Sequence, residues 1–397
     1  MKQMKQKIQE ILSRGVEEIH IRESLEKKLL SDKKLRIKHG IDPTGPKIHI
    51  GRAATLWKLR EFQDLGHQIV LIIGDYTAQI GDPSDKLAKR PFLSEEQVKE
   101  NMKSYEKQLG KILDMEKVEL RYNSEWLAKL TPRELDKLAD LFSVQQMIAR
   151  RNFKERWEKG EEISIRELHY PLYQGYDSVA VKADVEIGGS DQLFNLLAGR
   201  KIQEAYNQSP QDILTTKMIL GTDGRKMSTS WGNVINIIDE PEDMYGKVMS
   251  IIDELIIDYF TLCTRLPLEK IKEFERELKS GKNPRDIKMI LAYEIVKLYH
   301  GEEKAKEAQK NFVKIFQKKE APEEIPTKKV KSTVLFEILV ETGLASTKSE
   351  ARRLIEQGGI KVDNKTIKDI YFKPKISPKG ILIQKGKRYF VKVIPFE

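Results

Sequence analysis

The chain has 397 residues, of which 33% are charged and 39% hydrophobic, and its formal net charge is +10. This composition excludes a disordered or fibrous chain and is typical of two or three globular domains. The longest apolar run of the first domain, Ile69–Ile73, is too short for a bilayer span, and the charged N-terminus lacks a secretory signal. The single cysteine, Cys263, excludes an internal disulfide. We therefore expect a cytoplasmic protein without membrane contact.

The first part of the chain alternates strand-like and helix-like stretches. Residues 36–41 predict a strand, and from residue 53 apolar side chains recur at helical spacing. Residues 67–75 form a β-branched run, which is typical of a strand covered on both faces. Because parallel strands are joined by right-handed crossovers, this unit predicts an α/β domain with a Rossmann-like, doubly wound parallel sheet.

Further along, residues 94–165 predict a largely helical insertion, residues 179–192 a short strand region and residues 193–206 a helix. Residues 241–318 are rich in helix formers, and the charged, proline-containing residues that follow predict a linker. We therefore expect a catalytic domain at 1–225, a loop and α-helical domain at 226–318, a linker at 319–330 and a small α+β domain at 331–397.

The positive charge is concentrated at the C-terminal end. Residues 331–397 carry 14 Lys and Arg against 7 Asp and Glu, which is +7 of the total of +10. A small basic module of this kind is a candidate polyanion binder, although a basic surface that only aids solubility would have the same composition.

Two short segments suggest nucleotide chemistry. In "DPTGPKIHIGR", residues 42–52, His49 could donate a hydrogen bond to a phosphate and Gly51 lets a flat ring approach the backbone, at the end of a parallel strand where ligands bind. In "GTDGRKMSTS", residues 221–230, adjacent cations precede a run of hydroxyls, so this loop could cover a triphosphate. Either segment alone is also compatible with an ordinary connection or surface loop.

Together the two segments resemble the class I aminoacyl-tRNA synthetases, since "HIGR" is similar to the HIGH motif and "KMSTS" to the KMSKS motif of that family. The stretches "IDPTGPKIHIGR", "IGDPSDK" and "YPLYQGYDSVAVKADVEIGGSDQ" narrow the resemblance to tyrosyl-tRNA synthetases, from about residue 30 to the end of the chain. The resemblance implies tyrosine, ATP accompanied by Mg²⁺ and tyrosine tRNA as substrates, no protein-bound metal, and a homodimer with contacts near residues 130–165.

The resemblance also implies site residues. The amino-acid pocket would comprise Tyr170, Gln174, Asp177, Asp82 and Gln192. Of these, Asp177 can accept the phenol proton at the pocket floor, while Asp82, Tyr170 and Gln174 can hold the ammonium group. The implied ATP contacts are Gly40, Asp42, Thr44, His49, Gly51, Gly189 and Asp191, with Lys226, Met227 and Ser228 as a mobile cover and with Lys86 and Arg90 near the leaving phosphates or the tRNA end. Asn123 and Trp126 match a supporting segment whose role we expect to be structural.

Three positions depart from the family pattern. Arg52 replaces the last His of HIGH, and we expect it still to contact phosphate because its guanidinium suits that geometry. Thr229 replaces the second Lys of KMSKS, a loss for which Arg225 could compensate. Lys38 stands where many bacterial relatives carry a tyrosine that faces the substrate phenol, which leaves open what assists Asp177 there.

The C-terminal residues 333–395 resemble an S4 RNA-binding domain, and Lys348, Arg352 and Arg353 would lie on nearby turns of its second helix, facing tRNA phosphates. Three alternatives share parts of this pattern: a tryptophanyl-tRNA synthetase, a HIGH-type nucleotidyltransferase acting on a small acid, and a non-catalytic RNA-binding paralogue. A tryptophan enzyme would not need a carboxylate at Asp177, and a small-acid enzyme would not need an RNA-binding module.

Overall fold

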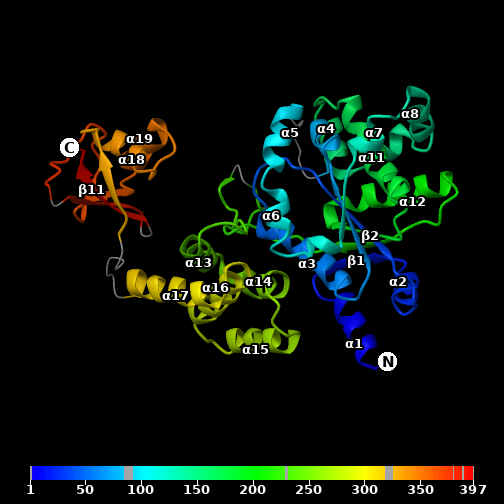
Figure 1. Cartoon of the computed structure of the whole chain (residues 1–397), viewed down its shortest axis with the longest axis horizontal. Coiled ribbons are helices and arrows are strands. Elements are labelled where there is room, and N and C mark those ends of the chain that lie inside the picture. Colours follow the sequence, from blue (N-terminus) through cyan, green and yellow to red (C-terminus); the bar gives the residue numbers. More distant parts are fainter. Residues whose placement is uncertain are drawn as a thin grey trace. The chain divides into compact units, whose positions relative to one another are not determined.

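The computed structural model describes residues 2–84, 93–228, 231–317, 325–378, 380–386 and 389–396 (Figure 1). The chain forms two compact units, the first made of residues 1–239 and 251–287 and the second of residues 240–250 and 288–397. No described helix has both the length and the apolar character needed to cross a membrane.

The core of the first unit is a six-stranded sheet in the order β1-β6-β5-β2-β3-β4. Its strands are β1 (Val16–His20), β2 (Arg36–Ile41), β3 (Gln68–Ile73), β4 (Val118–Tyr122), β5 (Val185–Gly189) and β6 (Asp212–Thr216). All neighbouring pairs are parallel except β1 and β6. The predicted Rossmann-like, doubly wound sheet is therefore confirmed. In β3, five of six residues are buried, as its continuous apolar run predicts.

Three helices position the site. Helix α3 (Ile50–Gln63) follows β2 and packs on β3, β5 and β6, while α11 (Ile165–Ala180) packs against α12 (Leu193–Ala205), which contacts β5 and β6. Helix α3 begins at His49, whose side chain caps it, and α11 begins with a capping box between Ser164 and Glu167.

The remaining described helices of the first unit are short. They are α1 (Lys2–Ile11), α2 (Arg22–Leu29), α4 (Thr77–Ile80), α5 (Glu95–Met102), α6 (Tyr105–Leu109), α7 (Ser124–Leu127), α8 (Pro132–Ala139), α9 (Val144–Ile148), α10 (Arg151–Glu158), α14 (Ile256–Cys263) and α15 (Leu268–Lys279), with 3-10 turns at Met115–Lys117, Ser190–Gln192 and Asp253–Leu255.

Some of the sequence predictions for this unit are wrong in detail. The insertion at 94–165 contains, besides the helices α5 to α10, the edge strand β4, which was not predicted because its residues are mostly half-buried and lack a strong apolar pattern. Strand β1 was not predicted either, since it is short, has no buried residue and is irregular where it pairs with β6. The predicted strand region at 179–192 begins inside α11 and only 185–189 forms a strand.

The second unit contains helices and a small α+β module. Its helices include α13 (Pro241–Met249), most of α16 (Pro284–His300) and α17 (Glu302–Gln317). The module has α18 (Leu335–Glu341), α19 (Lys348–Glu356) and a sheet in the order β7-β11-β10-β8-β9, formed by β7 (Thr327–Val330), β8 (Ile360–Val362), β9 (Lys365–Ile367), β10 (Ile381–Lys385) and β11 (Tyr389–Pro395). Buried aliphatic side chains of both helices and four of the strands form its core.

The predicted linker at 319–330 is corrected at its end. Residues 327–330 form β7, which pairs in parallel with β11 and thereby belongs to the module. The pairing partner lies more than sixty residues away in the sequence, so the local composition of charge and proline does not reveal it. Residues 318–324 lie outside the described part of the chain.

Candidate active site

A cavity of about 260 Å³ opens at the carboxyl ends of β2, β3 and β5, where ligands of parallel sheets bind. Both motif segments and the predicted amino-acid pocket line it. The predicted residues in its wall are Gly40, Asp42, Thr44, His49, Gly51, Arg52, Asp82, Tyr170, Gln174, Asp177, Gly189, Asp191, Gln192, Lys226 and Met227. Ser228 is described but does not line the cavity, and Lys86, Arg90 and Thr229 lie outside the described residues.

The turn before α3 presents one imidazole and one guanidinium. His49 Nδ1 accepts a hydrogen bond from the Arg52 backbone N–H at 3.3 Å, so the ring proton lies on Nε2, where it is available to a ligand. Burial, and then the Arg52 charge, lower the pKa of His49 to about 3. The ring is therefore neutral at pH 7. A Cβ at Gly51 would lie 3.0 Å from His49 Nδ1 and 3.3 Å from Met227 Sδ, which explains the glycine.

Arg52 is anchored within this turn. Its guanidinium donates to Thr44 Oγ1 at 3.0 Å, to the Asp42 carbonyl at 3.3 Å and to Tyr105 Oη at 3.2 Å. Since all three partners are neutral, the positive charge of Arg52 is not cancelled by a carboxylate in these contacts, and the side chain can attract an anion in the cavity.

Asp177 is held by two donors. The Trp126 indole donates to Oδ1 at 2.8 Å and the Asn123 amide to Oδ2 at 3.4 Å. Burial raises the pKa of Asp177 to about 7, against the opposing effects of the Lys38 ammonium and of these hydrogen bonds. Trp126 and Asn123 therefore orient a carboxylate at the edge of the cavity.

Asp42 joins the two predicted sets of residues. Its carboxylate accepts hydrogen bonds from Tyr170 Oη at 2.9 Å and from Thr77 Oγ1 at 2.8 Å. Burial raises the pKa of Asp42 to about 6, although both hydrogen bonds favour the ionised form. A Cβ at Gly74 would lie 2.0 Å from Asp42 Oδ1, so only glycine leaves room for this carboxylate.

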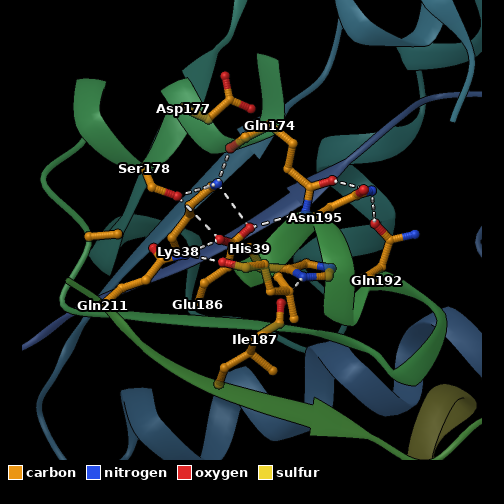
Figure 2. A network of polar contacts seen from close by, with 12 residues as sticks. Lys38, His39, Gln174, Asp177, Ser178, Glu186, Ile187, Gln192, Asn195 and Gln211 are labelled. Atoms are coloured by element: carbon orange, nitrogen blue, oxygen red, sulfur yellow. Dashed lines mark hydrogen bonds and ion pairs between the residues drawn. The ribbon is translucent and has the colours of Figure 1, made fainter. Parts of the chain in front are cut away.

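The three N–H groups of the Lys38 ammonium all contact protein groups, so none is left for a ligand. Its ammonium group donates to the backbone carbonyl of Gln174 at 2.7 Å, to Ser178 Oγ at 2.8 Å and to the Glu186 carboxylate at 2.9 Å (Figure 2). A lysine ammonium has three N–H groups, and all three are used. Lys38 therefore pairs with Glu186 in the interior, whereas the donors that hold Asp177 are Trp126 and Asn123.

A chain of amides leads from this pair through Gln174 and Asn195 to Gln192 (Figure 2), and Gln192 in turn contacts Asp82. Gln174 Nε2 donates to Glu186 at 3.2 Å, and Gln174 Oε1 accepts from Asn195 Nδ2 at 3.0 Å. Asn195 Nδ2 also donates to Gln192 Oε1 at 3.0 Å, and Gln192 Nε2 donates to Asp82 at 2.6 Å. One polar network therefore runs along the cavity between two carboxylates.

The loop after β6 brings a lysine to the cavity. Lys226 Nζ lies 3.5 Å from Asp191, and its side chain is 38% exposed. The backbone N–H of Ser228 donates to Asn233 Oδ1 at 2.8 Å. Arg225, by contrast, pairs with Asp223 at 2.6 Å and lies over the Trp231 ring, and it does not line the described cavity.

Sequence reasoning missed several polar residues of the site. Thr77, Glu186 and Asn195 hold the predicted residues in place, and His39, whose Nδ1 contacts the Ile187 carbonyl at 2.7 Å, lines the cavity. Only Glu186 carried a signal, because a charged residue within the apolar strand "VEIGG" needs a buried partner.

In the C-terminal module, Lys348, Arg352 and Arg353 are exposed on α19. The Arg352 guanidinium lies 4.4 Å from the centre of the Phe336 ring, and Lys348 pairs with Glu337 at 2.7 Å. The three predicted cations therefore lie on one exposed helix, as their spacing implies.

Comparison with known proteins agrees with this geometry. The family described as tRNA synthetases class I (W and Y) matches residues 30–317, and the S4 domain matches residues 335–377. The tyrosine–tRNA ligase of Thermotoga maritima is 51% identical over 96% of each chain, and that of Carboxydothermus hydrogenoformans is 48% identical over 97% of each.

A solved structure supports the fold independently of these relatives. The C-terminally truncated mitochondrial tyrosyl-tRNA synthetase of Aspergillus nidulans superposes with a TM-score of 0.65 at 24% identity, covering 79% of this chain and 98% of that one. From the family match and the full-length relatives together, the chain belongs to the class I aminoacyl-tRNA synthetases and, within them, to the tyrosine–tRNA ligases.

Proposed function

We propose that the protein joins tyrosine to ATP, giving tyrosyl-adenylate and pyrophosphate, and then transfers tyrosine to the 3′ end of tyrosine tRNA. One observation carries this proposal: the turn at His49, the loop at Lys226 and the buried Asp177 line the same cavity. Two distant nucleotide motifs and a buried phenol acceptor have a common use only if ATP and tyrosine bind side by side.

In this proposal, Asp177 accepts the hydrogen bond of the substrate phenol, while Asp82, Tyr170, Gln174 and Gln192 surround the ammonium group. ATP binds to the other predicted residues of the cavity, under the loop that carries Ser228 and Thr229, and Lys86 and Arg90 act near the leaving phosphates or the tRNA end. The predicted ATP residues of the cavity are Gly40, Asp42, Thr44, His49, Gly51, Arg52, Gly189, Asp191, Lys226 and Met227. Mg²⁺ enters as a companion of the ATP phosphates rather than as a protein-bound metal.

The chemistry needs alignment and charge more than proton transfer. The tyrosine carboxylate is already ionised and attacks the α-phosphorus, while the bond to the β-phosphate oxygen breaks and pyrophosphate leaves with its electron pair. Arg52 and Lys226 offset the charge that develops on the phosphates, and neutral His49 donates from Nε2. A hydroxyl of the terminal tRNA ribose then displaces AMP from the acyl group.

Pyrophosphate exchange tests this function directly. We expect ATP–pyrophosphate exchange to depend on tyrosine and to be negligible with tryptophan, since the buried Asp177 and its donors suit a phenol. Charging of tRNA should follow in the same preparation. Exchange that depends on tryptophan would favour a tryptophanyl-tRNA synthetase. Exchange without tRNA charging would favour a small-acid nucleotidyltransferase, and RNA binding without exchange would favour a non-catalytic paralogue.

The C-terminal module should act only in the second step. Replacing Lys348, Arg352 and Arg353 with alanine should lower tRNA charging and flatten its salt dependence, by about one unit of slope per lost phosphate contact, while exchange stays unchanged. The matched control changes three exposed lysines of the first unit, Lys270, Lys279 and Lys282. An equal loss of exchange in the first variant would contradict separate roles.

We also propose that the protein is a cytoplasmic homodimer. Its only cysteine, Cys263, is buried and free, as suits a reducing compartment. Within residues 130–165, large apolar side chains are exposed: Val144 at 63%, Trp157 at 65% and Ile165 at 72%. Such side chains favour burial against a second copy of the chain.

A further inference from the structure

The buried Lys38–Glu186 pair is fully occupied by protein groups. The Lys38 side chain is 0% exposed and that of Glu186 is 1% exposed. Besides Lys38, the Glu186 carboxylate accepts hydrogen bonds from Gln174 Nε2, from Ser178 Oγ at 3.2 Å and from Gln211 Nε2. Neither charged group has a hydrogen-bonding position left for a substrate, so the pair can influence a ligand only through its neighbours.

The carboxylates at the two ends of the amide chain determine how each amide is turned. Glu186 and Asp82 both accept, so the nitrogens of Gln174 and Gln192 must point outward toward them. The two amide oxygens then point inward, and Asn195 Nδ2 donates to both. Asn195 Oδ1, which is buried, has no hydrogen-bond partner among the described residues.

We infer that Glu186, held by Lys38, is a positioning residue for the ammonium group of tyrosine: it turns the Gln174 amide so that its nitrogen faces Glu186 and its oxygen faces Asn195 (Figure 2). An amide turned the other way would place N–H donors beside a cationic group. The inference deepens the proposed function and rests on it.

Two double variants isolate this role. Lys38→Met/Glu186→Gln and Lys38→Met/Glu186→Leu both remove the ion pair without stranding a buried charge. Only the glutamine variant keeps an oxygen that can accept from Gln174. The N–H₂ group of the new glutamine can donate to Gln211 Oε1, which lacks a partner among the described residues. The two variants therefore differ in the acceptor and not in the charge.

Tyrosine-dependent pyrophosphate exchange provides the measurement, with 3-(4-hydroxyphenyl)propionate, which lacks the amine, as a competitive inhibitor. In the leucine variant we expect the KM for tyrosine to rise about tenfold, the value of one hydrogen bond. The KM for ATP and the Ki of the inhibitor should stay within about twofold, because neither ligand depends on this interaction. The glutamine variant should recover most of the tyrosine affinity.

Equal tyrosine KM values in the two variants, or an inhibitor that weakens as much as tyrosine, would overturn the inference. The control Lys28→Met/Asp212→Asn removes an ion pair between α2 and β6, 2.9 Å apart, whose residues do not line the described cavity, and should lower Tm without changing KM. If the leucine variant does not fold, Lys38→Met/Glu186→Met, whose side chain is close in length to glutamine but cannot accept from Gln174, takes its place: it must raise the KM for tyrosine and leave the Ki of the inhibitor unchanged. A wild-type protein without tyrosine-dependent exchange would refute the proposed function instead.

Discussion

Asp177→Asn should lower kcat/KM for tyrosine about 10- to 100-fold, which is the range expected for losing a hydrogen bond to a charged acceptor. The asparagine amide can accept from only one of the two donors, Trp126 and Asn123, and would turn its own N–H₂ toward the other or toward the substrate phenol. The measurement is pyrophosphate exchange with tyrosine and with phenylalanine. Phenylalanine lacks the hydroxyl, so its kcat/KM should fall much less.

The pH dependence gives an independent check on Asp177. Because its pKa is raised to about 7, the carboxyl is protonated below that pH and ionised above it. The ionised form is the stronger acceptor for the phenol, so kcat/KM for tyrosine should rise with pH through about 7 in the wild type. Asp177→Asn should abolish this rise. If the variant keeps the same profile, another group, such as Asp42 with its pKa of about 6, is responsible.

Lys226→Ala should slow adenylate formation by about 10²- to 10³-fold, the usual cost of removing one donor that stabilises charge in a transition state. Its ammonium lies beside Asp191 at the cavity, and of the other lysines and arginines in the described part of the chain only Arg52 and Lys217 line it. Single-turnover formation of tyrosyl-adenylate measures this step, and tyrosine binding by equilibrium dialysis should be unchanged.

Lys272→Ala, on the exposed surface of α15, is the control for Lys226 and should have no effect.

Arg225→Ala tests whether Arg225 supplies the phosphate-stabilising charge that the threonine at position 229 lacks. If Arg225 compensates for the threonine at position 229, its loss should slow the reaction; from its pairing with Asp223 and its stacking on Trp231 we expect little change. An adenylation rate of Lys226→Ala close to that of the wild type would remove this lysine from the phosphate contacts.

The sequence was informative where structure depends on neighbours along the chain. The strand at 36–41, the helix after His49 and the apolar strand β3 follow from local pattern. About half of the residues that line the cavity are ones that the family resemblance implied. Strands β1, β4 and β7 were missed because each is short, and their burial depends on partners elsewhere in the chain. A short edge strand has no periodicity long enough to recognise.

The polar supports of the site could not be predicted for the same reason. Lys38 bonds Gln174 and Ser178 across 136 and 140 residues of sequence, and Asp42 bonds Tyr170 across 128. Residue type reveals that Lys38 is charged but not that all its protons are used within the protein. That fact depends on the three-dimensional positions of α11 and β5, which a single sequence does not contain.

The wall of the cavity extends along the chain from His39 to Met227. During synthesis, the first βα unit leaves the ribosome long before the loop that carries Lys226. A nascent chain that ends before residue 227 therefore cannot assemble a complete adenylation centre, and more than half of the polypeptide must be translated before the catalyst can exist.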